Sequence, residues 1–257
     1  MRRFLSAVSF LSIIPAGPGG EFDPRLLSRS LAFFSIVGGL FGCLLALLSA
    51  ALLRYLSPLV SAVIMAAAWT ALSGALHLDG LADTVDAFGG SRDRKRRLAI
   101  MKDSRIGAFG AAAVCIILLL KTALLAELGG AGGSIPFGGL SSALILSPVM
   151  GRTVMAASIV LFPSAKKTGL GSAFKANCRA VDVAVCALIA AAIAVVFRGA
   201  WGLALFAGIG AAGLCAAAGL SRGLGGLTGD SYGALCEGSE VLSLLALVFL
   251  PVGGLAG

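Results

Sequence analysis

Apolar runs long enough to cross a lipid bilayer are the feature that most limits what this chain can fold into. A helix needs about 20 residues to cross the hydrocarbon core. The chain has seven such runs, at residues 31–53, 58–76, 106–126, 138–162, 180–197, 200–220 and 232–250. Only 12% of its residues are charged, about half the share in ordinary soluble domains. The sequence therefore predicts an all-α polytopic membrane bundle of about seven transmembrane helices, forming one domain over residues 1–257, and disfavours a soluble protein.

Lys and Arg are concentrated in alternate joints between these runs. Joints rich in Lys and Arg stay in the cytoplasm. With a cytoplasmic N-terminus, the inner segments hold Arg2, Arg3, Arg25, Arg29, the basic stretch from Arg92 to Arg105, Lys166, Lys167, Lys175, Arg179 and Arg222, and the outer joints hold only Arg54, Lys121 and Arg198. The reverse orientation would translocate nearly all of the positive charge. We therefore predict a cytoplasmic N-terminus and an outer C-terminus.

The N-terminal segment, residues 1–30, has the outline of a signal peptide, because two arginines precede an apolar stretch and Pro15-Ala16. Cleavage after Ala16 would need a small residue three positions before the cut. That position holds the bulky Ile14. We therefore expect an uncleaved interfacial or re-entrant helix.

Three aspartates follow the second apolar run, in a predicted acidic and basic loop at residues 77–105. On a continuous helix Asp79, Asp83 and Asp86 would lie within about 60° of one another. Carboxylates on one stripe repel each other unless a cation lies among them, and hard oxygen ligands favour Mg²⁺. The alternative is a solvated helix end. His77, the only histidine, falls on another face and is interpreted as structural or interfacial, with a role in the site as the alternative.

A second acidic segment lies far along the chain on the same predicted side of the membrane. The two segments together hold eight of the twelve acidic residues, namely Asp79, Asp83, Asp86, Asp93, Asp103, Asp230, Glu237 and Glu240. Asp230 and Glu237 are seven residues apart and share a helix face. They follow a glycine-rich loop at residues 221–233, which would let backbone N–H groups approach an anion. A plain turn between two spans would use glycine as well.

Basic residues accompany these acids. The run Arg92–Arg97 is interpreted as a membrane anchor or a contact to anionic lipid. Lys102 and Arg105 flank Asp103, and cations interleaved with acids suit a site that holds both a metal and phosphate groups. Arg152 lies inside an apolar run, where a charge is costly and suggests function. It would bind a substrate phosphate or pair with an acid such as Glu237.

The order of these motifs resembles the cobalamin synthase family, the adenosylcobinamide-GDP ribazoletransferases. The resemblance rests on four stretches: His-Leu-Asp-Gly-Leu-Ala-Asp-Thr-Val-Asp-Ala at 77–87, Met-Lys-Asp-Ser-Arg-Ile-Gly-Ala-Phe-Gly at 101–110, Gly-Arg at 151–152, and Gly-Gly-Leu-Thr-Gly-Asp-Ser-Tyr-Gly-Ala at 225–234. It covers essentially the whole chain. One element departs from the family pattern near the start, where Ile13 replaces the usual arginine, so no role is assigned to a basic residue there.

The resemblance implies a transferase of the bacterial or archaeal cytoplasmic membrane, with its active site facing the cytoplasm. It would join adenosylcobinamide-GDP to α-ribazole or α-ribazole 5′-phosphate, late in the assembly of the nucleotide loop of cobalamin, and release GMP. The family and the residue pattern together predict Mg²⁺ at Asp79, Asp83, Asp86 and Asp103, with Asp103 or Asp86 as the catalytic proton acceptor. The predicted substrate-binding residues are Lys102, Arg105, Arg152, Asp230, Glu237 and His77.

Two other functions compete with this one. A CDP-alcohol phosphotransferase also uses spaced aspartates, but its Asp-x-x-Asp-Gly-x-x-Ala-Arg pattern is broken here by Leu76, Asp83 and Thr84. An ion-coupled transporter would carry its acids near the midplane, within repeated halves. Membrane lipids are expected partners and nucleic acid is not. The sequence leaves open the number of metal ions, a homo-oligomer, and an association with other late enzymes of the pathway.

Overall fold

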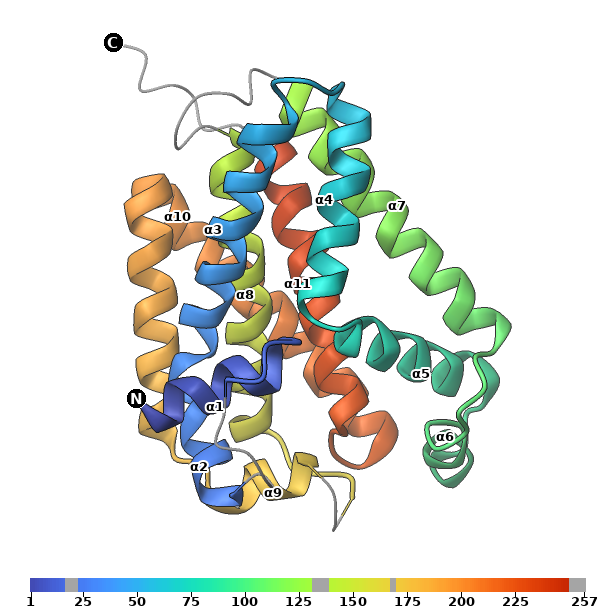
Figure 1. Ribbon diagram of the computed structural model, residues 1–257. Helices are drawn as coiled ribbons and strands as arrows, with labels where there is room; N and C mark the ends of the chain where they lie inside the picture. Colours follow the sequence, from blue (N-terminus) through green and yellow to red (C-terminus); the bar gives the residue numbers. More distant parts are fainter. Residues whose placement is uncertain (17–22, 131–138, 167–169, 250–257) are drawn as a thin grey trace.

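The computed structural model describes residues 1–16, 23–130, 139–166 and 170–249 (Figure 1). All regular elements of these residues are helices: α1 (Arg2–Leu11), α2 (Pro24–Arg29), the 3-10 turn η1 (Ser30–Phe33), α3 (Phe34–Leu52), α4 (Pro58–Leu72), α5 (Leu76–Gly90), α6 (Arg94–Ile100), α7 (Ala108–Gly130), α8 (Gly139–Leu161), α9 (Leu170–Asn177), α10 (Ala180–Leu224) and α11 (Gly229–Phe249). The predicted all-α membrane bundle is confirmed. Part of the N-terminal segment, residues 17–22, lies outside the described residues.

The number of membrane crossings depends on two broken helices. Among the described residues, five helices are long and apolar enough to span a membrane, or six if α4 and α5 count as one bent span. The 45-residue α10 contains a break at Gly199, whose φ of 55° and ψ of −138° are not helical. Its two halves correspond to the separate runs predicted at 180–197 and 200–220. About seven spans is thus roughly consistent with the structure.

The second predicted span ends earlier than the apolar run. α4 stops at Leu72, and Gly74 and Ala75 both have positive φ, 59° and 58°. The chain turns by 89° into α5. The sequence suggested that the aspartates extend a transmembrane helix, and the structure shows that they do not. They lie on α5, which runs across the end of the bundle (Figure 1) and is not counted here as a spanning segment.

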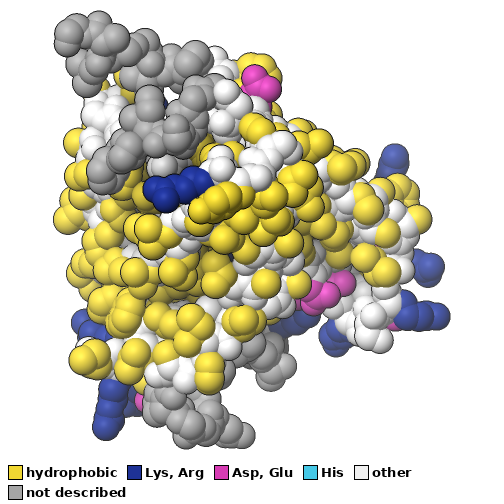
Figure 2. All heavy atoms as spheres, turned by 45° about the horizontal axis from the view of Figure 1, so that its top comes forward, with side chains coloured by type: hydrophobic (Ala, Val, Ile, Leu, Met, Phe, Trp, Pro, Cys, Tyr) yellow, Lys and Arg dark blue, Asp and Glu magenta, His cyan; other side chains and the backbone are white. Residues whose placement is uncertain are grey.

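α8 and α11 form the centre of the bundle. α8 is buried along nearly its whole length, from Leu140 to Ile159, and α3, α7, α10 and α11 pack around it. The outer helices expose large apolar side chains such as Leu47, Leu119 and Leu188. Hydrophobic side chains cover a broad band of the surface, and most of the visible Lys and Arg lie at its margins (Figure 2). Exposed apolar surface of this extent is expected of a lipid-facing protein.

The short helices gather at the same end of the bundle as α5. α1, α2, α6 and α9 all lie there, whereas α11 ends toward the opposite side (Figure 1). We call this the α5 end. The N-terminal segment is attached to it by a hydrogen bond from the Ile13 N–H to the Leu72 carbonyl, 3.1 Å. The α5 end therefore collects every segment in which the sequence predicted functional residues, except the spans that hold Arg152 and Glu237.

Candidate functional site

The two acidic segments meet where α5 crosses α11. A side-chain carbon at Gly80 would lie 2.6 Å from the carbonyl oxygen of Asp230, and one at Gly233 would lie 3.0 Å from the carbonyl oxygen of His77. Only glycine lets the two backbones approach so closely. The crossing brings the aspartates of α5 to the first turn of α11, 150 residues further along the chain.

Asp79, Asp83 and Asp230 form the acidic cluster of this crossing. Asp79 and Asp230 line one cavity from opposite helices. Partial burial, together with repulsion from Asp230, Asp79 and Asp86, raises the pKa of Asp83 to about 6. Lys166 lies beside the cluster, with its Nζ 3.8 Å from Asp230 Oδ2. Among the described residues, Lys166 is the only cation that forms an ion pair with these three carboxylates, and closely spaced carboxylates attract a cation.

Asp86 has a different role from the one predicted. Its carboxylate accepts the backbone N–H groups of Gly107, at 2.7 Å, and Gly110, at 2.8 Å. It therefore caps the N-terminus of α7, where free N–H groups and the helix dipole favour an anion. A side-chain carbon at either glycine would lie 2.4 Å from an Asp86 oxygen. The structure thus explains both glycines of the 101–110 stretch, and both oxygens of Asp86 are engaged at the start of α7.

Asp103 also departs from its prediction. It is exposed and forms a two-pronged ion pair with Arg105, at 3.0 Å to Nε and 2.7 Å to Nη2. These hydrogen bonds lower the pKa of Asp103 to about 2. Lys102 is exposed beside it. Within the described residues no three acidic side chains are grouped closely enough to hold a metal ion, so the structure does not bring the predicted four carboxylates together.

Arg152 and Glu237 lie in the interior of the bundle, in a buried charge cluster. Lys121 donates to Glu237, at 2.7 Å, and to Glu240, and Arg152 forms an ion pair with Glu240. Trp69 donates its ring N–H to Glu240 at 3.3 Å. The prediction that Lys121 belongs to an outer joint is wrong, because its side chain is only 3% exposed. Arg152 pairs with an acid, which the sequence offered as the alternative to substrate binding, and neither Arg152 nor Glu237 lines the cavity at the crossing.

The basic run and the glycine-rich loop are connected to each other. Arg94 donates to the Leu224 carbonyl at 2.7 Å, and Arg97 donates to the Gly223 carbonyl at 3.1 Å. These arginines cap the C-terminus of α10, where free carbonyls favour cations. In the loop, the Leu227 N–H donates to the Pro163 carbonyl at 2.8 Å. The loop is therefore a tightly bonded turn, and the run has a structural contact that its charge alone did not predict.

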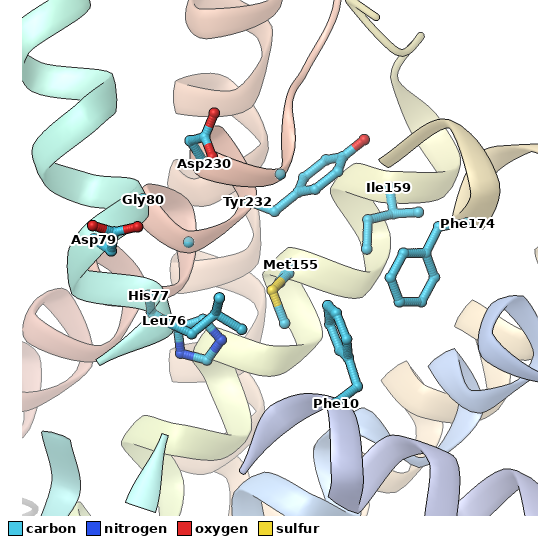
Figure 3. Close-up of a pocket in the computed structure, with 12 residues that line it drawn as sticks. Phe10, Leu76, His77, Asp79, Gly80, Met155, Ile159, Phe174, Asp230 and Tyr232 are labelled. Atoms are coloured by element: carbon cyan, nitrogen blue, oxygen red, sulfur yellow. The ribbon is translucent and has the colours of Figure 1, made fainter. Parts of the chain in front are cut away.

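A cavity of about 140 Å³ opens beside the acidic cluster. Asp79 and Asp230 lie along one side of it, and Phe10, Met155 and Phe174 lie on the other (Figure 3). The sequence did not single out these three apolar residues, which come from α1, α8 and α9, because no local pattern marks them. The predicted site residue His77 also lines the cavity and is 2% exposed.

The carboxylates at the crossing are of the kind that can hold Mg²⁺. Within the described residues, no three His, Cys, Asp or Glu side chains are grouped so that they alone would hold a metal ion. Mg²⁺ does not need such a cage, because it is usually held by one or two carboxylates, substrate phosphates and water. Asp79 and Asp83, one helical turn apart and short of neutralising partners, fit that arrangement.

Comparison with known sequences gives one consistent result. The family model described as cobalamin-5-phosphate synthase matches residues 3–248. Proteins named adenosylcobinamide-GDP ribazoletransferase are similar along nearly the whole chain. The relative from Roseiflexus sp. is 37% identical over 94% of this chain and 87% of its own, and that from Stutzerimonas stutzeri is 40% identical over 98% and 100%. A third, from Pseudomonas fluorescens, is 41% identical over 96% and 99%. No solved structure matches the chain.

Proposed function

The chain belongs to the cobalamin-5-phosphate synthase family, and we propose that it joins adenosylcobinamide-GDP to α-ribazole or α-ribazole 5′-phosphate. The product is adenosylcobalamin or its 5′-phosphate, and GMP is released. This is the function that the named relatives indicate. The structural observation that carries it is the α5–α11 crossing, which joins two acidic motifs separated by 150 residues beside one cavity.

In this reaction the protein itself forms no covalent bond with either substrate. A ribose hydroxyl of α-ribazole attacks the phosphorus linked to cobinamide, a new oxygen–phosphorus bond forms, and the bond from that phosphorus to the GMP oxygen breaks. The site must hold the two substrates in line, offset the charge on the departing GMP and take up the hydroxyl proton. Lys166, beside Asp230, is the cation placed to contact a phosphate oxygen at the crossing.

We propose that Asp79 and Asp83 are ligands of Mg²⁺. When bound, the ion would offset the negative charge of the pyrophosphate and of the leaving group. Asp230 faces the same cavity from α11. Since Asp86 and Asp103 are engaged elsewhere, Asp230 replaces them here as the proposed acceptor of the hydroxyl proton.

We also propose that the α5 end faces the cytoplasm of a bacterial or archaeal cell, across the cytoplasmic membrane. The helix α6, which holds Arg94 and Arg97, lies at this end, as does α2, which holds Arg25 and Arg29 (Figure 1). This agrees with the rule that positive segments stay inside. Both substrates are water-soluble, so a cytoplasmic mouth would give them direct access. The competing phosphotransferase and transporter functions have no comparable support from the relatives.

An assay with membranes that contain the protein tests this function. Adenosylcobinamide-GDP, α-ribazole and Mg²⁺ are supplied, and GMP and the corrinoid product are followed together. We expect both products to form in equal amounts. Transport of an ion without product, or reaction of CDP-linked lipids with the corrinoid untouched, would contradict the proposal.

A further inference from the structure

We infer that the cavity at the α5–α11 crossing is the subsite for the base of α-ribazole, a flat and largely apolar benzimidazole. The inference rests on the proposed function and goes beyond it, because it assigns one part of one substrate to one set of side chains. It also gives the N-terminal helix a role in substrate specificity.

The cavity changes from charged to apolar across its width. Asp79 and Asp230 lie on one side, and Phe10, Met155, Ile159 and Phe174 lie on the other (Figure 3). A nucleoside has the same polarity, with a ribose at one end and a base at the other. Seated with its base against the aromatic side chains, it would present its ribose hydroxyls to the acidic cluster, where the reaction takes place.

The size and polarity of the cavity indicate which chemical group of the two substrates it can bind. A volume of about 140 Å³ has room for one bicyclic ring and excludes a corrin macrocycle. Guanine and adenine would also fit by size, but each has several donors and acceptors on its edge, and an apolar wall would leave these unpaired at a cost of about 1–3 kcal/mol for each group. The glycosylated benzimidazole has no N–H donor and only one free ring nitrogen. It is the best match to the apolar wall.

His77 supplies the one polar group that this base needs. Its ring is 2% exposed, and neither Nδ1 nor Nε2 has a hydrogen-bond partner among the described residues. A buried imidazole without a partner is uncommon. His77 lines the cavity, and a turn of its ring would let one N–H donate to the free ring nitrogen of the benzimidazole. The base would thereby be fixed in one orientation, and His77 is assigned as a substrate-binding residue.

The apolar wall is held rigid by a cluster of three phenylalanines. Phe10 packs edge-on against Phe174, with ring centroids 4.9 Å apart, and stacks on Phe34 at 6.0 Å. Phe34 in turn contacts Phe174 at 6.1 Å. These contacts tie α1, α3 and α9 together and place Phe10 at the cavity. The N-terminal helix thus contributes to the subsite although its segment lacks the arginine usual in the family.

Steady-state kinetics with the full-length protein in membranes test this inference. Met155→Trp should fill the cavity, and His77→Leu should remove the donor to the base. We expect each to raise the KM for α-ribazole roughly tenfold, the effect of one lost hydrogen bond or of a partly blocked site, while the KM for adenosylcobinamide-GDP changes less than about twofold. His77→Gln, which retains an N–H donor, should restore most of the affinity.

The control is Leu119→Trp, which places the same large side chain on a lipid-facing position that is 69% exposed. It should change neither KM. Because Met155→Trp risks misfolding, the comparison of His77→Leu with His77→Gln tests the inference independently of it. An unchanged KM for α-ribazole in His77→Leu, or a raised KM for adenosylcobinamide-GDP instead, would overturn the inference while leaving the proposed function intact. Absence of product with the wild-type protein would overturn the function itself.

Discussion

The backbone of Gly80 touches the backbone of Asp230, so closely that a side-chain carbon at Gly80 would lie 2.6 Å from the Asp230 carbonyl oxygen. This contact joins the two acidic motifs into one site. It places Asp79 of α5 and Asp230 of α11 beside one cavity. The spacing between α5 and α11 is therefore as important to the chemistry as the carboxylates themselves.

Gly80→Ala should reduce kcat roughly 100-fold, since a displacement of about 1 Å is enough for such a loss. The added carbon meets backbone atoms of α11, so the helices must move apart. Gly238→Ala is the matched control, because it lies on α11 with nothing within 4 Å of the added carbon, and it should retain full activity. The measurement is GMP release from membranes that contain equal amounts of each protein. Full activity of Gly80→Ala would show that the crossing is not critical.

Asp83→Asn should lower product formation roughly a thousandfold, because a metal ion supplies several kcal/mol of transition-state stabilisation. Treatment with EDTA should have the same effect on the wild-type protein, reversed by added Mg²⁺. Glu127→Gln, an exposed acid on α7, is the control and should be neutral. Product that forms at the full rate in EDTA would exclude the metal.

Asp86→Asn should destabilise the protein without changing its requirement for Mg²⁺. The carboxylate accepts two backbone N–H groups at the start of α7, and an amide can accept only with its single oxygen. We expect a loss of about 1–3 kcal/mol in the free energy of unfolding, seen as a lower midpoint of thermal unfolding in detergent. Gly110→Ala should act in the same way. A large rise in the Mg²⁺ concentration needed for half-maximal rate would instead restore Asp86 as a ligand.

Lys121→Met should destabilise the bundle by about 3–5 kcal/mol, because it leaves a buried carboxylate without its cation. Lys121 is shared between Glu237 and Glu240, and Arg152 also pairs with Glu240. The double variant Lys121→Met/Glu237→Gln removes one charge of each sign and should recover most of the loss. Resistance to thermal inactivation measures both. Equal loss in the single and double variants would mean that shape, and not charge, is what the cluster requires.

The stability of the metal-free protein should rise as pH falls from about 7 to 5. The pKa of Asp83 is raised to about 6, so the folded state binds this proton more tightly than the unfolded state does. The stabilisation is therefore present at low pH and lost as pH rises through about 6. Asp83→Asn should remove this dependence, and Mg²⁺ should stabilise the wild-type protein more at pH 7 than at pH 5. The measurement is the midpoint of thermal unfolding in EDTA, recorded between pH 7 and pH 5 for the wild-type protein and for Asp83→Asn.

Several features could be predicted from single stretches of sequence. Runs of about 20 apolar residues can adopt few structures in lipid, because every backbone polar group there must be hydrogen-bonded within a helix or a closed barrel. The scarcity of acids elsewhere pointed to two acidic segments, and Asp79, Asp83 and Asp230 are three of the eight acids in them. These inferences needed only composition and local spacing, and they located three residues that the crossing does bring together.

Other features were decided only by tertiary contacts. Helical periodicity places Asp83 and Asp86 on one stripe, but it gives only a direction around one axis and cannot tell what lies opposite. The N-terminus of α7 lies against Asp86 and uses it as a cap, while Asp83 remains beside Asp230. For the same reason Lys121 could not be predicted to lie inside the bundle, because its partners are on another helix.

The sequence by itself determined a membrane bundle with two acidic segments, because burial in lipid and charge repulsion act on local patterns. Only the tertiary structure decided which acids form the site. The 89° turn after α4 directs α5 across the bundle, and the close approach of Gly80 to Asp230 joins segments 150 residues apart. The cavity beside them depends on Phe10 and Phe174 as well, which acquire a common function only when α1 and α9 pack together.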